Sequence, residues 1–281
     1  MSEILVFFLI LFAAILHATW NLIIKSLPDS LVAMGMMNLL QSIVFIPLVF
    51  LVPLPSDITW YFIFGSVILH NVYFITLGQT YNKDDLTIIY PIARGCAPVF
   101  VAILSLIILK EKISMQGTLG IIIVSLALLL LTAEHYKKKF NFYVFKISIF
   151  IALVISIYTL FDSAGIRSSK NSISYIIWIF FLEGWVTFGY VYLRKKNEVF
   201  KTNKKEYILI SLGSLMSFVA YGIVMSAFKY IPTGYVASLR ESSIIMATLL
   251  GLLFLKEKIS IIRILSACIF FIGVVLIYNS Y

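Results

Sequence analysis

Long apolar runs alternate with short polar breaks along the whole chain. The breaks carry proline, aspartate or lysine, as in the segments 53–57 and 110–112. Because about 20 apolar residues in a helix cross a hydrocarbon core of about 30 Å, this pattern predicts ten membrane spans. Their predicted ranges are 4–26, 30–52, 58–80, 86–109, 114–132, 144–165, 172–193, 207–228, 233–255 and 260–278. Only the loops after the fifth and seventh spans are longer, so any function is expected within the membrane bundle.

The composition supports the same fold class. Hydrophobic residues make up 61% of the 281 residues and charged residues only 12%, whereas a soluble domain carries about 25% charged residues. A lipid bilayer removes the need for a polar surface. We therefore predict an all-α polytopic membrane protein whose surroundings are lipid.

The net charge of +9 could suggest a nucleic-acid partner, but the basic residues flank the apolar runs and form no continuous face. No nucleic-acid partner is predicted. Cys96 and Cys268 both fall inside apolar segments, which favours small buried side chains over a disulfide or a metal site. We predict no cofactor and no metal.

An internal repeat organises the spans. The hexapeptide Leu-Lys-Glu-Lys-Ile-Ser occurs at 109–114 and again at 255–260. The same offset places Arg94 on Arg240, whereas the match of the first span to the sixth is weaker and depends on Asn21 and Asp162. The predicted halves are residues 1–135 and 140–281. Five spans in each half would invert the second half relative to the first, an arrangement typical of secondary transporters.

The basic residues also predict the orientation. Thirteen lysines and arginines lie on the side reached after odd-numbered spans and five on the other side. Lysine-rich loops remain in the cytoplasm, so both termini are expected outside a multi-pass protein of the cell (inner) membrane.

Charged groups inside spans are costly, and those retained usually face the protein interior. Five such residues occur: Arg94, Asp162, Glu183, Arg240 and Glu241. We expect the two arginines, one from each half, to flank a midplane site, because a guanidinium binds a carboxylate or phosphate through paired hydrogen bonds. Glu183, near the middle of its span, could serve an ammonium group or a proton.

Aromatic and polar residues extend this candidate substrate site. His17 and Asn21 share one helix face with Trp20 beside them, because residues four apart are neighbours on a helix. Tyr158 shares a face with Asp162 in the same way, and Tyr90 precedes Arg94 by one turn. Their rings could hold an amine by cation–π contact.

Structural roles compete with these assignments. The arginines could only neutralise Asp162, Glu183 or Glu241, and Asp162 could be an exposed loop residue. Glu183 could pair locally, and His17 could be a hydrogen-bonded core residue or a proton carrier. The two Lys-Glu-Lys segments are expected to set helix ends and topology, with gating as the alternative.

Several motifs resemble one known family. The segment from His17 to Asn21, the two Leu-Lys-Glu-Lys-Ile-Ser copies and Ala97-Pro98-Val99-Phe100 are similar to motifs of the drug/metabolite transporter superfamily, in its EamA-like ten-helix branch. The resemblance covers the whole chain, but Glu241-Ser242-Ser243-Ile244 stands where the first half has proline. It implies two inverted five-helix repeats and a central cavity lined by helices 1, 3, 4, 6, 8 and 9. It also implies transport of small metabolites such as amino acids or amines.

The sequence therefore predicts a secondary transporter that moves a small polar or zwitterionic metabolite by alternating access. It predicts no enzyme, because no Gly-x-Ser-x-Gly, Walker or His-x-x-x-His motif occurs. An intramembrane enzyme, or another polytopic protein without transport activity, is the alternative. Proton coupling is left open, as is the choice between a monomer and a homodimer.

Overall fold

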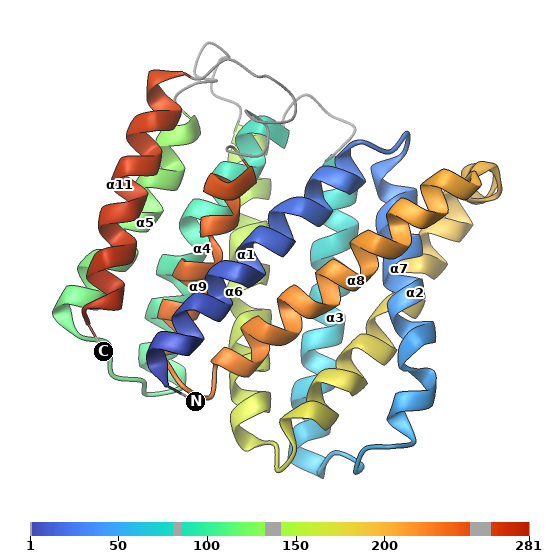
Figure 1. Ribbon diagram of the computed structural model, residues 1–281, viewed down its shortest axis with the longest axis horizontal. Coiled ribbons are helices and arrows are strands. Elements are labelled where there is room, and N and C mark those ends of the chain that lie inside the picture. Colours follow the sequence, from blue (N-terminus) through green and yellow to red (C-terminus); the bar gives the residue numbers. More distant parts are fainter. Residues whose placement is uncertain (1, 81–85, 133–141, 248–259, 281) are drawn as a thin grey trace.

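The computed structural model describes residues 2–80, 86–132, 142–247 and 260–280, and these residues form helices joined by short turns (Figure 1). The helices are α1 (Glu3–Lys25), α2 (Ser30–Val49), α3 (Asp57–Thr80), α4 (Leu86–Ile108), α5 (Met115–Leu130), α6 (Phe142–Ser168), α7 (Ser172–Lys201), α8 (Lys204–Ala227), α9 (Thr233–Arg240) and α11 (Ile261–Tyr278). Among them, eight are long and apolar enough to cross a membrane. The all-α polytopic class is confirmed.

Polar side chains begin these helices at the breaks seen in the sequence. Asp29 Oδ1 accepts hydrogen bonds from the first backbone N–H groups of α2, at 3.0 and 3.1 Å. At the start of α8, Asn203 and Glu206 each bond to the other's backbone N–H, at 3.0 and 3.1 Å. Such caps satisfy donors that have no partner inside the helix.

Two helices differ from the expected spans. The region after residue 193 was expected to be a loop, but α7 continues to Lys201 across a kink at Lys195, whose φ of −136° and ψ of 35° are not helical. The span expected at 233–255 is interrupted early, since α9 ends at Arg240 and Glu241 forms a turn before helical residues 242–247. The rest of that span, with the second Leu-Lys-Glu-Lys-Ile-Ser copy, lies outside the described residues.

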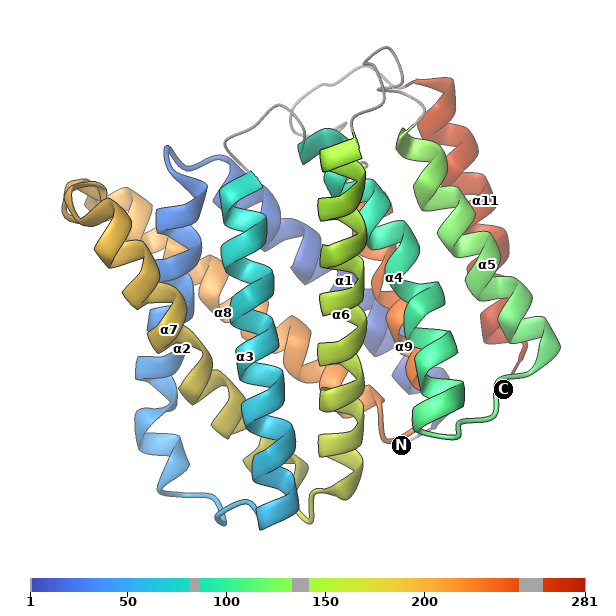
Figure 2. The ribbon, with the colours of Figure 1, turned by 180° about the vertical axis from the view of Figure 1, so that it is seen from behind.

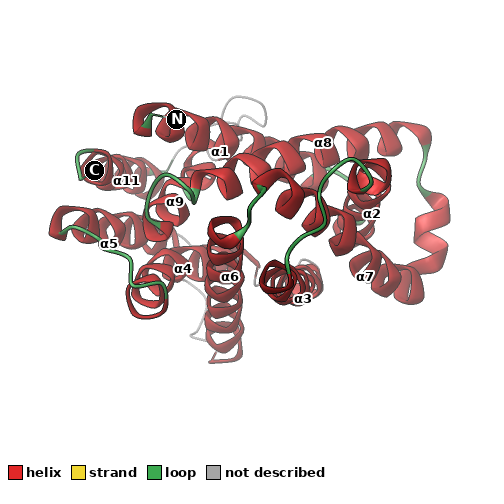
Figure 3. Cartoon of the chain, turned by 90° about the horizontal axis from the view of Figure 1, so that it is seen from below, coloured by secondary structure: helices red, strands yellow, loops and turns green. Residues whose placement is uncertain are grey.

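Pairs of helices define the layout of the bundle. Seen along the helices, α5 and α11 lie at one edge and α2 and α7 at the other, with α1, α3, α4, α6, α8 and α9 between them (Figure 3). From behind, α3 and α6 run side by side (Figure 2). The six central helices are those that the family resemblance implied as the lining of a cavity.

Small residues let the edge pairs approach closely. A Cβ at Gly120 of α5 would lie 2.9 Å from the carbonyl oxygen of Gly273 on α11, and the reverse distance is the same. A Cβ at Gly184 of α7 would lie 2.0 Å from the carbonyl oxygen of Asn38 on α2. Helices that pack inside lipid use such positions because close backbone contact replaces the hydrophobic effect.

The distribution of polarity is that of a protein in lipid. Large apolar side chains such as Phe64, Ile68 and Phe271 are more than half exposed, whereas Asp162 and Glu241 are fully buried. A bilayer solvates the first kind and forces the second kind inward. Cys268 is also exposed, so its predicted burial is wrong, because an apolar thiol needs no burial where lipid is the solvent.

Candidate functional site

Titratable side chains from the bundle helices meet in the interior and form two groups. The histidine cluster consists of His70, Ser66, Asp162, Tyr175, Glu183 and Tyr221, from α3, α6, α7 and α8. The arginine cluster consists of Arg94, Arg240, Glu241 and Ser243, from α4 and the region around the end of α9. The ionisable members Asp162, Glu183, His70, Arg94, Arg240 and Glu241 are each at most 5% exposed.

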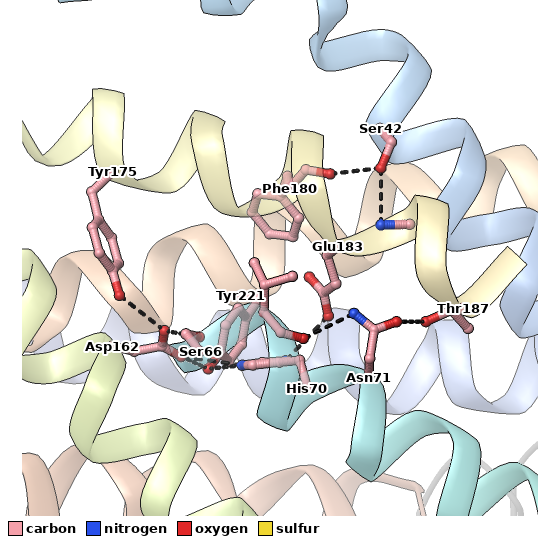
Figure 4. Close-up of polar contacts among 12 residues, drawn as sticks. Ser42, Ser66, His70, Asn71, Asp162, Tyr175, Phe180, Glu183, Thr187 and Tyr221 are labelled. Atoms are coloured by element: carbon pink, nitrogen blue, oxygen red, sulfur yellow. Dashed lines mark hydrogen bonds and ion pairs between the residues drawn. The ribbon is translucent and has the colours of Figure 1, made fainter. Parts of the chain in front are cut away.

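His70 bridges two carboxylates (Figure 4). Its Nε2 lies 3.2 Å from Asp162 Oδ2, and its Nδ1 lies 3.2 Å from Glu183 Oε1. Both ring nitrogens therefore face a negative oxygen, and an imidazole can donate to both only when both nitrogens carry a proton. The sequence alternatives that placed Asp162 in an exposed loop, or paired these carboxylates with the arginines, are wrong.

Hydroxyl groups complete the surroundings of Asp162. Ser66 Oγ donates to Oδ1 at 2.5 Å, and the Tyr175 hydroxyl donates to the same oxygen at 3.3 Å. The Tyr221 hydroxyl donates to Oδ2 and lies 3.2 Å from His70 Nε2. Both oxygens of Asp162 are thus occupied as acceptors.

Neutral hydrogen bonds hold α7 in the position from which Glu183 reaches inward. The Thr187 hydroxyl donates to the Asn71 side chain at 2.6 Å, one residue from His70. On the other side, Ser42 of α2 accepts from the backbone N–H of Gly184 at 3.0 Å. Although α7 lies at the edge of the bundle, these contacts direct Glu183 to the centre.

The arginine cluster carries two guanidinium groups and one carboxylate. Arg94 Nε lies 2.6 Å from Glu241 Oε2, whereas Arg240 Nε is 3.8 Å from Glu241 Oε1. Arg94 also reaches Ser243 Oγ, at 3.4 Å. Among the described residues, the buried Nε and Nη2 atoms of Arg240 have no hydrogen-bond partner, and neither do Arg94 Nε and the two Glu241 oxygens, but Arg94 has its close ion pair and Arg240 does not. Arg240 is thus the less satisfied of the two cations, although desolvated charges normally require partners.

The helix break gives this cluster its shape. The N–H of Glu241 bonds to the carbonyl of Ser238 three residues back, at 3.1 Å, which tightens the last turn of α9. Arg240 and Glu241 therefore stand where a helix in the membrane is interrupted. Discontinuous helices of this kind build the substrate and ion sites of many transporters.

The structure places the other candidate site residues around the arginines. His17 lies within electrostatic range of both guanidinium groups and packs edge-on against Trp20, with ring centroids 4.9 Å apart. The centre of the Arg94 guanidinium is 5.7 Å from the Tyr90 ring centroid. Asn21 is less directly engaged, because its side-chain amide donates to the backbone carbonyl of His17 at 2.8 Å.

Tyr158 connects the two clusters. Its ring centroid lies 4.0 Å from that of His70, and its hydroxyl lies within electrostatic range of both Arg94 and Arg240. Tyr221 likewise contacts Asp162 and faces Arg240. The two clusters are therefore electrostatic neighbours inside one bundle.

Sequence reasoning missed His70 as a site residue. A histidine is formally neutral at pH 7 and does not stand out among charged residues, although an ionisable group at membrane depth is a functional candidate by default. Tyr221 was missed as well. The described residues contain no set of three or more His, Cys, Asp or Glu side chains arranged to hold a metal ion.

A separate polar contact closes the end of the bundle at which the termini lie. Glu111, in the turn between α4 and α5, accepts from the backbone N–H of Thr233 at 2.9 Å and from its hydroxyl at 2.7 Å. It also forms an ion pair with Arg167 of α6, which donates to the backbone carbonyl of Phe228 at 2.7 Å. Pro232 gives α9 no side-chain cap, so Glu111 supplies one from the other half of the chain.

Residues 144–279 match the EamA-like transporter family, which confirms the family resemblance found in the sequence. Among curated proteins, none matches this chain. In contrast, 28 chains of solved structures do. One of them, a crystal structure of a protein, covers 97% of this chain and 94% of its own, with a TM-score of 0.73 and 11% sequence identity. At that identity the likeness concerns the fold alone.

Proposed function

We propose that this chain, a multi-pass membrane transporter of the EamA-like family, is a secondary transporter for a small zwitterionic metabolite such as an amino acid. The substrate carboxylate binds at Arg240 and Arg94, at the break after α9. The halves 1–135 and 140–281 are inverted repeats that open the site to one side of the cell membrane at a time.

The observation that carries this proposal is the state of Arg240. Two of its buried nitrogen atoms have no hydrogen-bond partner among the described residues, and the arginine cluster holds two cations for one carboxylate. A substrate carboxylate would supply the missing acceptor and the missing negative charge through charge-assisted hydrogen bonds. The guanidinium fork matches a carboxylate better than a spherical anion.

Aromatic residues beside the arginines suit the other end of a zwitterion. Tyr90 and Trp20 lie on α4 and α1, and Tyr158 lies on α6. An ammonium group is attracted to the face of such rings. His17 and Asn21 contribute polar atoms on the same side of α1 as Trp20.

The helix directions support inverted repeats. In Figure 1, α1 and α5 begin at the end where both termini lie, whereas their counterparts α6 and α11 begin at the opposite end. Counterparts also pack on each other, α2 on α7 and α5 on α11, and α1 packs on α8 as α6 packs on α3. The Glu111 contacts suit a state closed at the terminal end, which the charge distribution of the loops assigns to the outside of the cell.

A ligand screen followed by flux measurement tests the proposal. Purified protein is tested for thermal stabilisation by amino acids, amines and phosphonates, and each hit is assayed for uptake into proteoliposomes. We expect amino acids to stabilise the protein and to be transported, and Arg240→Gln to weaken both effects strongly.

Arg194 provides a matched control, because it is exposed and stacks on Tyr190, with 5.6 Å between its guanidinium carbon and the ring centroid. Arg194→Gln should transport normally. If Arg240→Gln transports as well as Arg194→Gln, the proposed carboxylate site is wrong.

A further inference from the structure

His70, Asp162 and Glu183 form a buried group whose formal charges do not sum to zero. The ion pairs that the described residues give to Asp162 and Glu183 both lead to His70. One imidazolium between two carboxylates leaves a net charge of −1 at a site where each residue is at most 5% exposed. A buried charge needs a partner at low dielectric, so this group depends on the positive charge next to it or takes up one more proton.

The geometry indicates where that charge would go. Both oxygens of Asp162 already accept hydrogen bonds, from Ser66 and Tyr175 on one oxygen and from Tyr221 on the other. Glu183 faces His70 through Oε1. A proton can therefore bind to the Glu183 carboxylate more easily than to Asp162. Its uptake would bring the net charge of His70, Asp162 and Glu183 to zero.

We propose that His70, Asp162 and Glu183 are the proton-binding site of this transporter, and that one proton taken up there from one side of the membrane is released to the other side in each transport cycle. Glu183 takes up the proton, His70 relays it within the cluster, and Asp162 fixes the imidazole. This inference depends on the proposed transport function and assigns its coupling ion.

The other ionisable groups around His70 fit this role. From α6 the cluster is faced by Asp162 and Tyr158, from α7 by Glu183 and Tyr175, and from α8 by Tyr221. The other helix that packs on α3, α2, has no titratable residue in its sequence. From the helices behind α6 and α8, the charged groups within electrostatic range of Tyr158 and Tyr221 are Arg94 and Arg240. Proton uptake is therefore the change that neutralises the cluster when this positive charge is occupied by a substrate.

The neighbouring arginine cluster explains how the proton and the substrate are coupled. That cluster carries a net charge of +1, so the two clusters together are neutral before any substrate binds. The carboxylate of a bound zwitterion cancels the positive charge at Arg240, while its ammonium group lies at the aromatic rings. Proton uptake by Glu183 is favoured because the carboxylate then replaces the histidine cluster as the partner of Arg240. Tyr158 and Tyr221 connect the two clusters, so this coupling acts over a short path.

The first test separates coupling from transport. Proteoliposomes with a pH-sensitive dye inside receive a mixture of the twenty L-amino acids, and a second assay follows exchange of the labelled mixture at equal pH. We expect wild-type transport to move protons and a one-unit pH difference to drive accumulation of up to about tenfold. Glu183→Gln, which mimics the protonated state, should keep exchange and lose both the proton movement and the accumulation.

Glu198→Gln is the matched control, because it removes a carboxylate from the same helix at an exposed ion pair with Lys201, 3.0 Å long, outside both clusters. It should retain coupling. Wild-type exchange with no proton movement would overturn the proton site and leave the proposed function intact, whereas no exchange in the wild type would refute the amino-acid substrate instead.

The second test observes His70 in the wild-type protein without bound substrate. The chain has three histidines, His17, His70 and His135, so ¹⁵N-histidine labelling gives three imidazole signals that His17→Gln and His135→Gln assign. We expect His70 in the wild type to show both nitrogens protonated at neutral pH. It should also respond to a pH step over the same range in which the transport rate changes. A neutral imidazole that does not respond to pH would overturn the proposal.

Discussion

The two arginines of the arginine cluster should respond in opposite ways to the same substitution. Arg94 has a carboxylate partner at 2.6 Å, and both side chains are at most 2% exposed. Arg94→Gln would leave Glu241 buried without its close cation, and breaking a buried ion pair from one side costs about 3–5 kcal/mol. We therefore expect Arg94→Gln to lower the thermal unfolding temperature strongly.

Arg240→Gln should leave stability within about 1 kcal/mol of the wild type, or raise it. Glu241 keeps Arg94 as its partner in this variant, and the cluster loses a charge whose Nε and Nη2 atoms have no hydrogen-bond partner among the described residues. Replacing a poorly compensated buried charge with a neutral side chain is often neutral or stabilising. Stability measurements alone would then suggest that Arg240 contributes nothing to the fold.

In contrast to its small effect on stability, Arg240→Gln should have a large effect on substrate binding. A hydrogen bond to a charged group contributes about 1.5–3 kcal/mol, so Arg240→Gln should weaken amino-acid binding about 10- to 150-fold. The assay is thermal unfolding of each purified variant in detergent with and without ligand. The reasoning is refuted if Arg240→Gln unfolds as readily as Arg94→Gln, or if it binds ligand as tightly as the wild type.

Three other regions give independent tests. Glu111→Gln removes the charge that pairs with Arg167 and should loosen the contacts at the terminal end of the bundle. The reporter is a cysteine introduced by Ser163→Cys, beside Thr233, in a background with Cys96 and Cys268 replaced. This cysteine should react faster with an impermeant thiol reagent in the Glu111→Gln variant, and an unchanged rate would contradict the closing role of Glu111. Gly184→Ala would place a Cβ 2.0 Å from the Asn38 carbonyl oxygen, so it should lower the stability of the protein in thermal unfolding by about 1–3 kcal/mol. Gly189→Ala on the same helix is the control, because a Cβ there would have no described atom within 4 Å and should not lower the stability. Asn203→Ala removes the cap of α8 and should cost about 1 kcal/mol in the same measurement, and no loss would show that the capping box is dispensable.

The fold class followed from the sequence because membrane spans obey one strong physical constraint. Backbone groups in lipid must be bonded within the segment, so length and apolarity predict helices such as α1 and α8 closely. The extension of α7 to Lys201 was missed because charged residues mark the end of a span rather than the end of a helix. The break at Glu241 was not predicted, because the turn there is closed by a hydrogen bond to the residue three positions back and contains no proline.

Individual site residues were easier to predict from the sequence than the ion pairs that they form. Arg94, Arg240, Asp162 and Glu183 stood out because charges at membrane depth are rare, and all four are buried. Their pairing could not be read from the sequence, because it depends on how α3, α6 and α7 are rotated about their axes. Nothing in the spacing of His70, Asp162 and Glu183 indicates that one imidazole meets both carboxylates.

The pairing also bears on the two roles that the sequence left open for the arginines, substrate contact and neutralisation of Asp162, Glu183 or Glu241. If both arginines served only to neutralise buried carboxylates, each of them would have a close carboxylate partner. Instead His70 takes Asp162 and Glu183. Arg94 takes Glu241, and Arg240 keeps buried nitrogens without a hydrogen-bond partner among the described residues. A bundle that needed only stability gains nothing from separating a cluster of charge +1 from one of charge −1. That separation is useful when an anionic group and a proton must bind at neighbouring positions and leave together, and for this reason the charges of this membrane interior favour a carrier over a static scaffold.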